Sequence, residues 1–90
     1  MRVHWIVEGA VQGVGFRMWT ARKARSLGIA GWVTNRPDGS VEVEAEGDVE
    51  AMAILEARIR KGPVHATVAS CRRVTPGEDT LPERFEVRRT

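Results

Sequence analysis

The clearest candidate for chemistry in this chain is the segment VQGVGFR at residues 11–17, in which two glycines precede an arginine. Gly13 and Gly15 can adopt positive φ angles at little cost, so the backbone can curl until successive N–H groups point at one centre. If a helix begins near Phe16, its first N–H groups have no partners within the helix, and its dipole adds partial positive charge. The guanidinium of Arg17 adds a planar, permanently charged fork. These groups predict a site for a phosphate or carboxylate that needs no metal.

Two common nucleotide-binding motifs are absent from this segment. It has no third glycine to complete GxGxxG and no GK[ST] to complete a Walker loop. Many glycine-rich turns between a strand and a helix bind nothing. For the segment taken alone, an empty turn is therefore as good an interpretation as an anion site, and a second motif is needed to decide.

That second motif is GWVTNRPDGSVEVEAEG at residues 31–47. With VQGVGFR it resembles the signatures of the acylphosphatases, small hydrolases of the carboxyl–phosphate bond, and the two motifs agree with the family in order and spacing. A looser likeness continues to a late Phe-Glu-Val, so the resemblance covers nearly the whole chain. It implies that Arg17 binds the substrate phosphate and that Asn35 positions the attacking water. It also implies that the loop binds the substrate through Val11, Gln12, Gly13, Val14, Gly15, Phe16 and Arg17.

The chain departs from the family pattern at two positions. Ala10 stands where the family commonly has arginine, and Thr34 stands where a basic or amide side chain is usual. Neither departure removes a catalytic group, but the loss of nearby positive charge can weaken the field that attracts an anionic substrate. We therefore expect affinity or rate to be affected more than the type of reaction.

The residues that are missing from the two motifs restrict the substrate. Neither motif has a carboxylate or histidine placed as a general acid, and no cluster of Asp or His indicates a metal. A carboxylate leaving group departs without protonation, because the pKa of its conjugate acid is about 4. Asn35 can accept a hydrogen bond from water through its carbonyl oxygen while its amide donates to the substrate. We expect hydrolysis of acyl phosphates without a cofactor, and not of ordinary phosphate monoesters.

Other functions remain as alternatives. Asn35 alone could simply start the turn before Pro37 and Asp38, although the presence of both motifs favours the catalytic role. The loop could belong to a non-catalytic module that binds phosphate or an acyl phosphate. RNA-recognition domains share the same order of strands and helices, but the basic, aromatic-rich strand that they need is absent. We therefore expect a small-molecule substrate and no nucleic-acid partner.

Hydrophobic periodicity predicts the elements that position these residues. Residues 2–8 alternate as a strand with one buried face, and residues 17–27 have apolar positions at helical spacing before a stop at Gly28. A hairpin is predicted from strands 29–35 and 41–46 around the turn at Pro37–Gly39.

The second half of the chain predicts a helix and two more strands. Asp48 is a candidate N-cap for the helix, which ends at Gly62 and Pro63. Strands fit residues 66–74 and 85–88, with a mobile loop, TPGEDTLPE, between them. This order predicts an α+β, ferredoxin-like split βαβ fold (βαββαβ), with two helices on one face of an antiparallel sheet. In that topology the first loop and the end of the second strand can meet, which would bring Arg17 near Asn35.

Composition is consistent with one small domain at residues 1–90. The net charge of +2 is too small to demand a nucleic-acid partner, and basic pairs are interpreted as solvated surface. The single cysteine, Cys71, excludes an internal disulfide and is expected to be buried. The apolar run at the N-terminus is too short for a signal peptide or a membrane span. We expect a cytoplasmic monomer.

Ordinary structural roles are expected for the remaining chemically interesting side chains. His4 and His65 are expected to have surface or cross-strand roles. The row Glu42, Glu44 and Glu46 is expected to lie on a solvated, acidic strand face. The tryptophans are expected to pack in the core or on the sheet, namely Trp5, Trp19 and Trp32.

Overall fold

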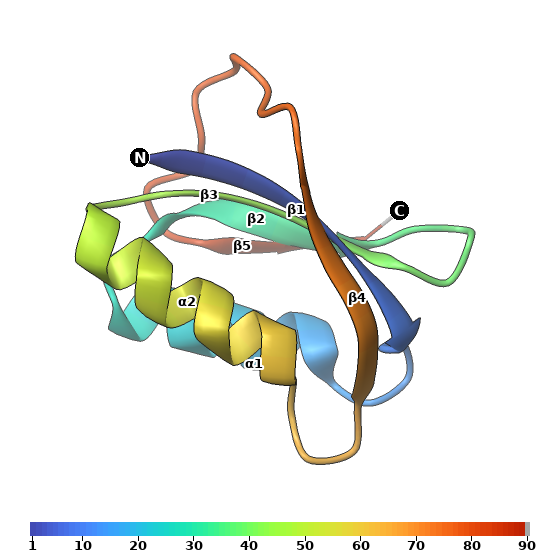
Figure 1. The fold of residues 1–90 in the computed structure, drawn as a ribbon. Coiled ribbons are helices and arrows are strands. Elements are labelled where there is room, and N and C mark those ends of the chain that lie inside the picture. The colour runs from blue at the N-terminus through green and yellow to red at the C-terminus, as the bar shows by residue number, and fades with distance from the viewer. Residues whose placement is uncertain (90) are drawn as a thin grey trace.

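The computed structural model describes residues 1–89, so Thr90, the last residue of the expected domain, lies outside the described part. Five strands form one sheet in the order β4-β1-β3-β2-β5, and both helices cover one face of it (Figure 1). The α+β, ferredoxin-like architecture is confirmed. The elements are β1 (Arg2–Ala10), α1 (Phe16–Ser26), β2 (Ala30–Asn35), β3 (Val41–Glu46), α2 (Val49–Lys61), β4 (Thr67–Val74) and β5 (Glu86–Arg88).

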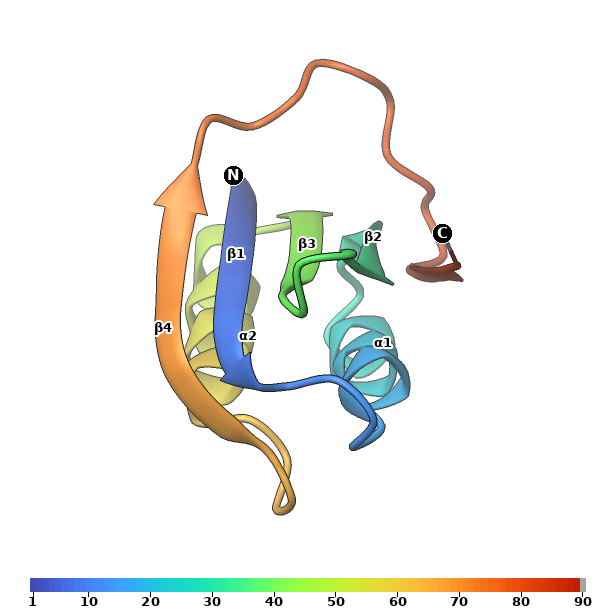
Figure 2. The same ribbon diagram turned by 90° about the vertical axis from the view of Figure 1, so that its right-hand side faces the viewer.

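The sheet is mixed rather than wholly antiparallel. Strand β1 pairs antiparallel with both β3 and β4, and β2 pairs antiparallel with β3, as expected. The last strand, β5, instead pairs parallel with β2. Figure 2 shows the reason: the segment after β4 arches from one edge of the sheet to the other. Strand β4 runs opposite to β1 and therefore to β2, so a segment that re-enters the sheet at the end where β4 finishes makes β5 run in the same direction as β2.

Helix α2 begins and ends where its capping residues predict. The Asp48 carboxylate accepts a hydrogen bond from the backbone N–H of Ala51 at 2.8 Å, which confirms the predicted N-cap of α2, and α2 ends before Gly62, whose φ is 75°. Helix α1 differs, because the residue before it is Gly15 in a left-handed conformation with no side-chain cap. Its first turn also has no acidic residue.

The core lies between the helices and the inner face of the sheet. Trp5, Val33 and Leu55 are fully buried there. Cys71 is also buried, as expected, and this burial raises the pKa of its thiol. Neither helix within residues 1–89 is long and apolar enough to cross a membrane.

The prediction of a solvated acidic face is wrong for Glu44, which is only 4% exposed. Its carboxylate accepts hydrogen bonds from the Arg2 guanidinium at 2.9 Å and from the Gly77 backbone N–H at 2.7 Å. These partners offset the cost of burying the charge. His4 has the cross-strand role expected for it, because its Nε2 lies 2.6 Å from Glu42 Oε2.

The segment predicted to be a mobile loop is attached to the sheet at several points. Gly77 binds Glu44, and the carbonyl of Pro82 accepts a hydrogen bond from Gly31 N–H at 3.0 Å. The side chain of Leu81 is buried. The segment therefore covers part of the outer sheet face rather than extending freely into solvent.

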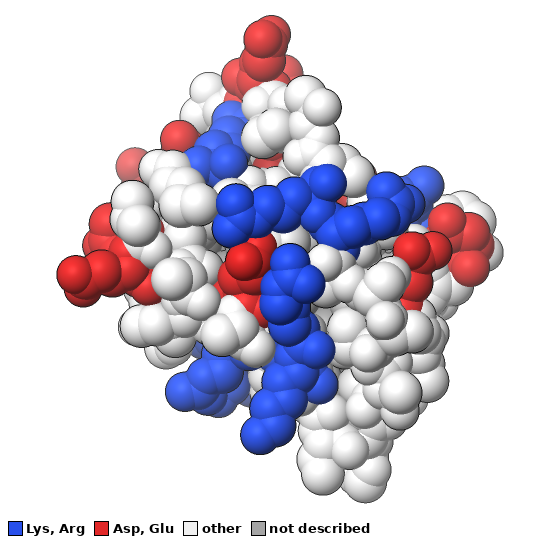
Figure 3. Space-filling model, in the orientation of Figure 1, with Lys and Arg blue, Asp and Glu red and all other residues white. Residues whose placement is uncertain are grey.

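Basic side chains gather on the face formed by α2 and β4, where they surround a small acidic patch (Figure 3). Both Arg60 and Arg73 approach Glu56, at 3.9 Å and 2.7 Å. On β4, Arg72 lies 3.5 Å from Glu8. Part of this basic surface is therefore neutralised by carboxylates of the same chain, as expected for a solvated face.

Candidate active site

The loop between β1 and α1 contains two glycines in left-handed backbone conformations. Gly13 and Gly15 have φ angles of 75° and 77°, in the left-handed region. A Cβ atom added to either glycine would meet no atom within 4 Å, so each position requires glycine for its conformation and not for space. The loop leads directly into α1, whose N-terminal N–H groups and dipole favour an anion.

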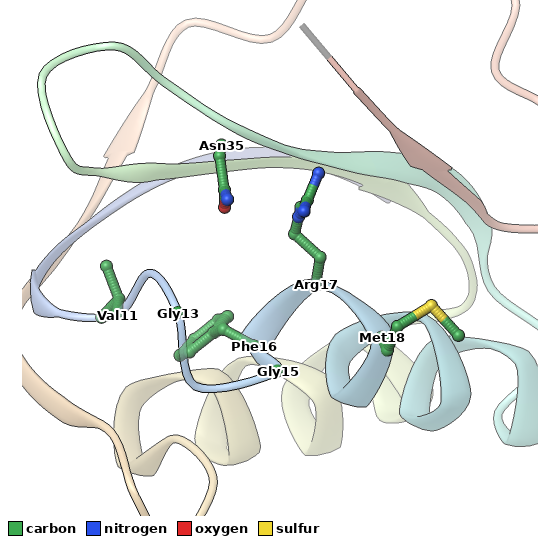
Figure 4. Close-up of a pocket in the computed structure, with 7 residues that line it drawn as sticks. All are labelled: Val11, Gly13, Gly15, Phe16, Arg17, Met18 and Asn35. Carbon is green, nitrogen blue, oxygen red and sulfur yellow. The ribbon is translucent and has the colours of Figure 1, made fainter.

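Arg17 and Asn35 reach the same cavity from two different elements. Arg17 lies in the first turn of α1, and Asn35 is the last residue of β2. Figure 4 shows the guanidinium and the amide projecting into the space between the loop and the sheet. The cavity has a volume of about 120 Å³ and is lined by Val11, Gly13, Gly15, Phe16, Arg17, Met18 and Asn35.

Most N–H donors of the Arg17 guanidinium make no hydrogen bond to the described residues 1–89. Within residues 1–89 its hydrogen bond is a long one, from Nη1 to the carbonyl oxygen of Arg88 at 3.4 Å. A guanidinium has five N–H donors in a fixed fork, so this contact orients the group without saturating it. A tetrahedral oxyanion in the cavity could accept hydrogen bonds from two of the remaining N–H donors.

The tip of the β2–β3 hairpin is held rigidly beside Asn35. Asp38 Oδ1 accepts hydrogen bonds from the backbone N–H of Ser40 at 2.9 Å and from its hydroxyl at 2.5 Å. These bonds from Ser40 are the main reason that the pKa of Asp38 lies below its usual value. A backbone bond from Arg36 N–H to the Ser40 carbonyl closes the turn at 2.8 Å. Asp38 therefore stabilises the turn that the sequence predicted at Pro37–Gly39, which is confirmed.

The structure brings together most of the loop residues that the sequence suggested. Val11, Gly13, Gly15, Phe16 and Arg17 all line the cavity.

Two predicted residues have other surroundings, and one lining residue was missed. The Gln12 amide points to the hairpin, where it donates to Arg36 and Ser40 carbonyls, and Val14 packs against the core. Met18 lines the cavity although it is 49% exposed. Its place next to Arg17 in the first helical turn was the available signal for it.

The two departures from the family pattern differ in their surroundings. Thr34 precedes Asn35 on the same strand, so its side chain points to the opposite face of the sheet. It is 7% exposed and pairs in register with Glu42 and Arg88. Ala10 ends β1 one residue before the cavity wall and is exposed. A basic side chain at position 10 would therefore face solvent near the cavity. A basic side chain at position 34 would instead have to fit among the buried groups on the opposite, outer face of the sheet.

The chain is a small α+β protein, a split βαβ sandwich in which a glycine-rich loop with Arg17 and the amide of Asn35 lie on opposite sides of one cavity (Figure 4). The sequence matches the family model for acylphosphatase over residues 3–87. An acylphosphatase of Nitratidesulfovibrio vulgaris is 46% identical over 89 residues, which cover 97% of this chain and 89% of that protein. One of Chlorobaculum tepidum is 45% identical over 86 residues, covering 96% and 94%.

Structural comparison agrees with the sequence comparison. The crystal structure of acylphosphatase from Bacillus subtilis has a TM-score of 0.87 and 33% sequence identity, and 96% of each chain is covered. The chain belongs to the acylphosphatase family, whose members hydrolyse acyl phosphates to a carboxylate and inorganic phosphate.

Proposed function

We propose that this chain hydrolyses the carboxyl–phosphate bond of small acyl phosphates in the cavity between the 11–17 loop and the end of β2. The observation that supports this most strongly is the approach of Arg17 and Asn35 to one cavity beside two left-handed glycines. Neither motif alone would distinguish a catalytic site from a turn. With Arg17 and Asn35 on opposite walls, the cavity can hold a phosphate and a water molecule next to each other, as hydrolysis requires.

The phosphoryl group binds to the loop N–H groups, the N-terminus of α1 and the Arg17 guanidinium. Each of these groups carries positive charge or partial positive charge, and none has to move for the reaction. As water attacks phosphorus and the bond to the carboxylate oxygen lengthens, charge on the equatorial phosphoryl oxygens is stabilised by donors already in place. Most of the catalysis is therefore electrostatic and positional.

Asn35 orients the attacking water. Its side-chain carbonyl accepts a hydrogen bond from water, and its amide group donates to the phosphoryl group, so that the oxygen lone pair faces phosphorus. Asn35 cannot remove the proton, so the proton passes to an oxygen of the substrate phosphate. The seven residues that line the cavity include no carboxylic acid and no histidine, which fits a leaving group that departs without protonation.

The size of the cavity is suited to the phosphoryl end of the substrate and not to the whole molecule. A volume of about 120 Å³ accommodates a phosphoryl group and its water, while the acyl group extends towards the mouth beside Met18. Both Arg17 and Asn35 belong to the same chain, so a monomer contains the complete proposed site.

Release of inorganic phosphate from benzoyl phosphate and from phenyl phosphate, measured in excess chelator, tests this proposal. We expect cleavage of the acyl phosphate alone and its loss in folded Arg17→Ala, with a rise in the dissociation constant of inorganic phosphate measured by titration calorimetry. Binding of phosphate without cleavage of either compound would instead identify the non-catalytic binding module.

A further inference from the structure

We infer that Gln12 is a positioning residue, which fixes the phosphate-binding loop to the strand end that carries Asn35. This inference rests on the proposed function, because it concerns the alignment of two halves of the proposed site. The loop and Arg17 form the first half, and Asn35 with the β2–β3 turn forms the second half. The catalytic groups come from separate segments, so something must set the distance between them.

The hydrogen bonds of Gln12 join these two halves directly. Its Nε2 donates to the carbonyl oxygen of Arg36 at 2.7 Å and to that of Ser40 at 2.9 Å. Both acceptors belong to the turn that begins immediately after Asn35. Gln12 itself lies between Val11 and Gly13, two residues of the cavity wall.

A single amide group is suited to this task. It has two N–H donors at a fixed angle, and here they meet the two carbonyl oxygens at the base of one turn. The Arg36 N–H also binds the Ser40 carbonyl at 2.8 Å, so the two acceptors are held at a constant separation. The pair of bonds therefore restrains both the distance and the rotation of the loop relative to the hairpin.

The environment of Gln12 separates this role from core packing and from direct substrate binding. The residue is exposed, so its replacement leaves no core cavity. Both of its donors are already used by the hairpin, and Gln12 is not one of the residues that line the pocket. Loss of its bonds should leave each half of the site intact and misalign the two halves.

Replacement of Gln12 by methionine tests the inference, because methionine has a similar length and no donor. We expect kcat for benzoyl phosphate to fall roughly tenfold to a hundredfold, since a misplacement of about 1 Å can reduce a rate by that amount. The inhibition constant for inorganic phosphate should stay within about twofold, because the loop and Arg17 remain together on one side of the lost bonds.

A double-mutant cycle with Asn35→Ala distinguishes positioning from other roles. In the Asn35→Ala background, Gln12→Met should reduce kcat by less than about twofold, because the group it aligns is already absent. Arg25→Met is the matched control: it removes a side-chain bond to the Phe85 carbonyl, 2.9 Å long, that ties the C-terminal half of α1 to the residue before β5, away from the cavity. This control should keep the kcat of the unsubstituted chain.

Three results would overturn the inference. A large rise in the phosphate inhibition constant of Gln12→Met would mean direct binding of the substrate by Gln12. An unchanged kcat with a lowered midpoint of thermal unfolding would mean a purely structural role. An equal loss of kcat with and without Asn35 would mean that the two residues act independently. Absence of turnover in the unsubstituted chain would contradict the proposed function itself and is recognised before any variant is compared.

Discussion

Arg17 and Asn35 face one cavity from opposite walls, although one belongs to the first turn of α1 and the other to the end of β2 (Figure 4). The topology of the sheet explains their approach. Strand β1 runs antiparallel to β3, and β3 runs antiparallel to β2, so the C-terminal ends of β1 and β2 lie at the same end of the sheet. The loop that follows β1 and the last residue of β2 consequently meet there.

This arrangement predicts separate effects for the two side chains. Because Asn35 acts on water and Arg17 on phosphate, Asn35→Ala should reduce kcat by roughly a hundredfold to a thousandfold, with the inhibition constant for inorganic phosphate nearly unchanged. Steady-state kinetics with phosphate as competitor measures both quantities. A folded Asn35→Ala variant that turns over like the unsubstituted chain would remove the water-orienting role.

Position 10 has alanine where the family commonly has arginine, so we expect replacement of Ala10 by arginine to raise kcat/KM. The residue is exposed and directly precedes Val11 of the cavity wall, so Ala10→Arg should attract an anionic substrate without disturbing the core. We expect kcat/KM to rise roughly threefold at low ionic strength and the gain to shrink towards one at about 0.5 M salt, because mobile ions screen exposed charges.

Glu78→Gln serves as the matched control for Ala10→Arg, since it also raises the net charge by one, at an exposed residue of the 75–84 segment. It should change kcat/KM less than Ala10→Arg does. Equal gains for both variants would show that net charge is responsible and that position 10 has no local effect.

The glycines predict a contrast in stability between two alanine variants. A Cβ atom at Gly31 would lie 2.0 Å from the Glu44 carbonyl oxygen, so Gly31→Ala must displace a central strand pair and should cost at least about 3 kcal/mol. Gly15→Ala meets open space and should cost only about 1–2 kcal/mol for the left-handed conformation. Denaturant unfolding measures both costs, and equal losses would contradict the contrast.

Local signals in the sequence were sufficient for the elements and for much of the site. Asp48 and Gly62 mark the ends of α2 because capping depends only on neighbouring backbone groups. The left-handed conformations of Gly13 and Gly15 follow likewise from residue type. These features depend on chemistry within a few residues.

Features that depend on distant partners could not be predicted in the same way. Alternation placed Glu44 in a solvated row, but its burial depends on Arg2 and on Gly77, which are far away in the sequence. The parallel pairing of β5 depends on where a long crossover returns to the sheet. For Gln12 the motif indicated contact with the substrate, and only the folded hairpin reveals the carbonyl groups to which it donates.

The carboxylate of Glu56 predicts how stability depends on pH. Its Oε1 accepts hydrogen bonds from the Trp5 indole at 2.6 Å and from Arg73 Nε at 2.7 Å. The bond from Arg73 is the largest cause that lowers the pKa of Glu56, with help from Trp5, although partial burial acts in the opposite direction. A carboxylate whose pKa is lower in the folded state stabilises the fold fully above its unfolded pKa. That contribution is lost as pH falls through the folded value.

Glu56→Gln therefore should be less stable than the unsubstituted chain at pH 7, by about 1–2 kcal/mol, and the difference should shrink towards zero as the pH falls below the ordinary carboxyl pKa. Glutamine can still accept the bonds from Trp5 and from Arg73 Nε through its carbonyl oxygen. Its NH2 group cannot accept the bond that Glu56 Oε2 receives from Arg73 Nη2 at 3.1 Å, so the variant removes the charge and this bond together. Urea unfolding from pH 7 to pH 2.5 measures the difference, with the exposed Glu83→Gln as the control that should show little effect. A difference that stays constant over this range would show that Glu56 stabilises the fold through packing or neutral hydrogen bonds, and that its charge contributes nothing.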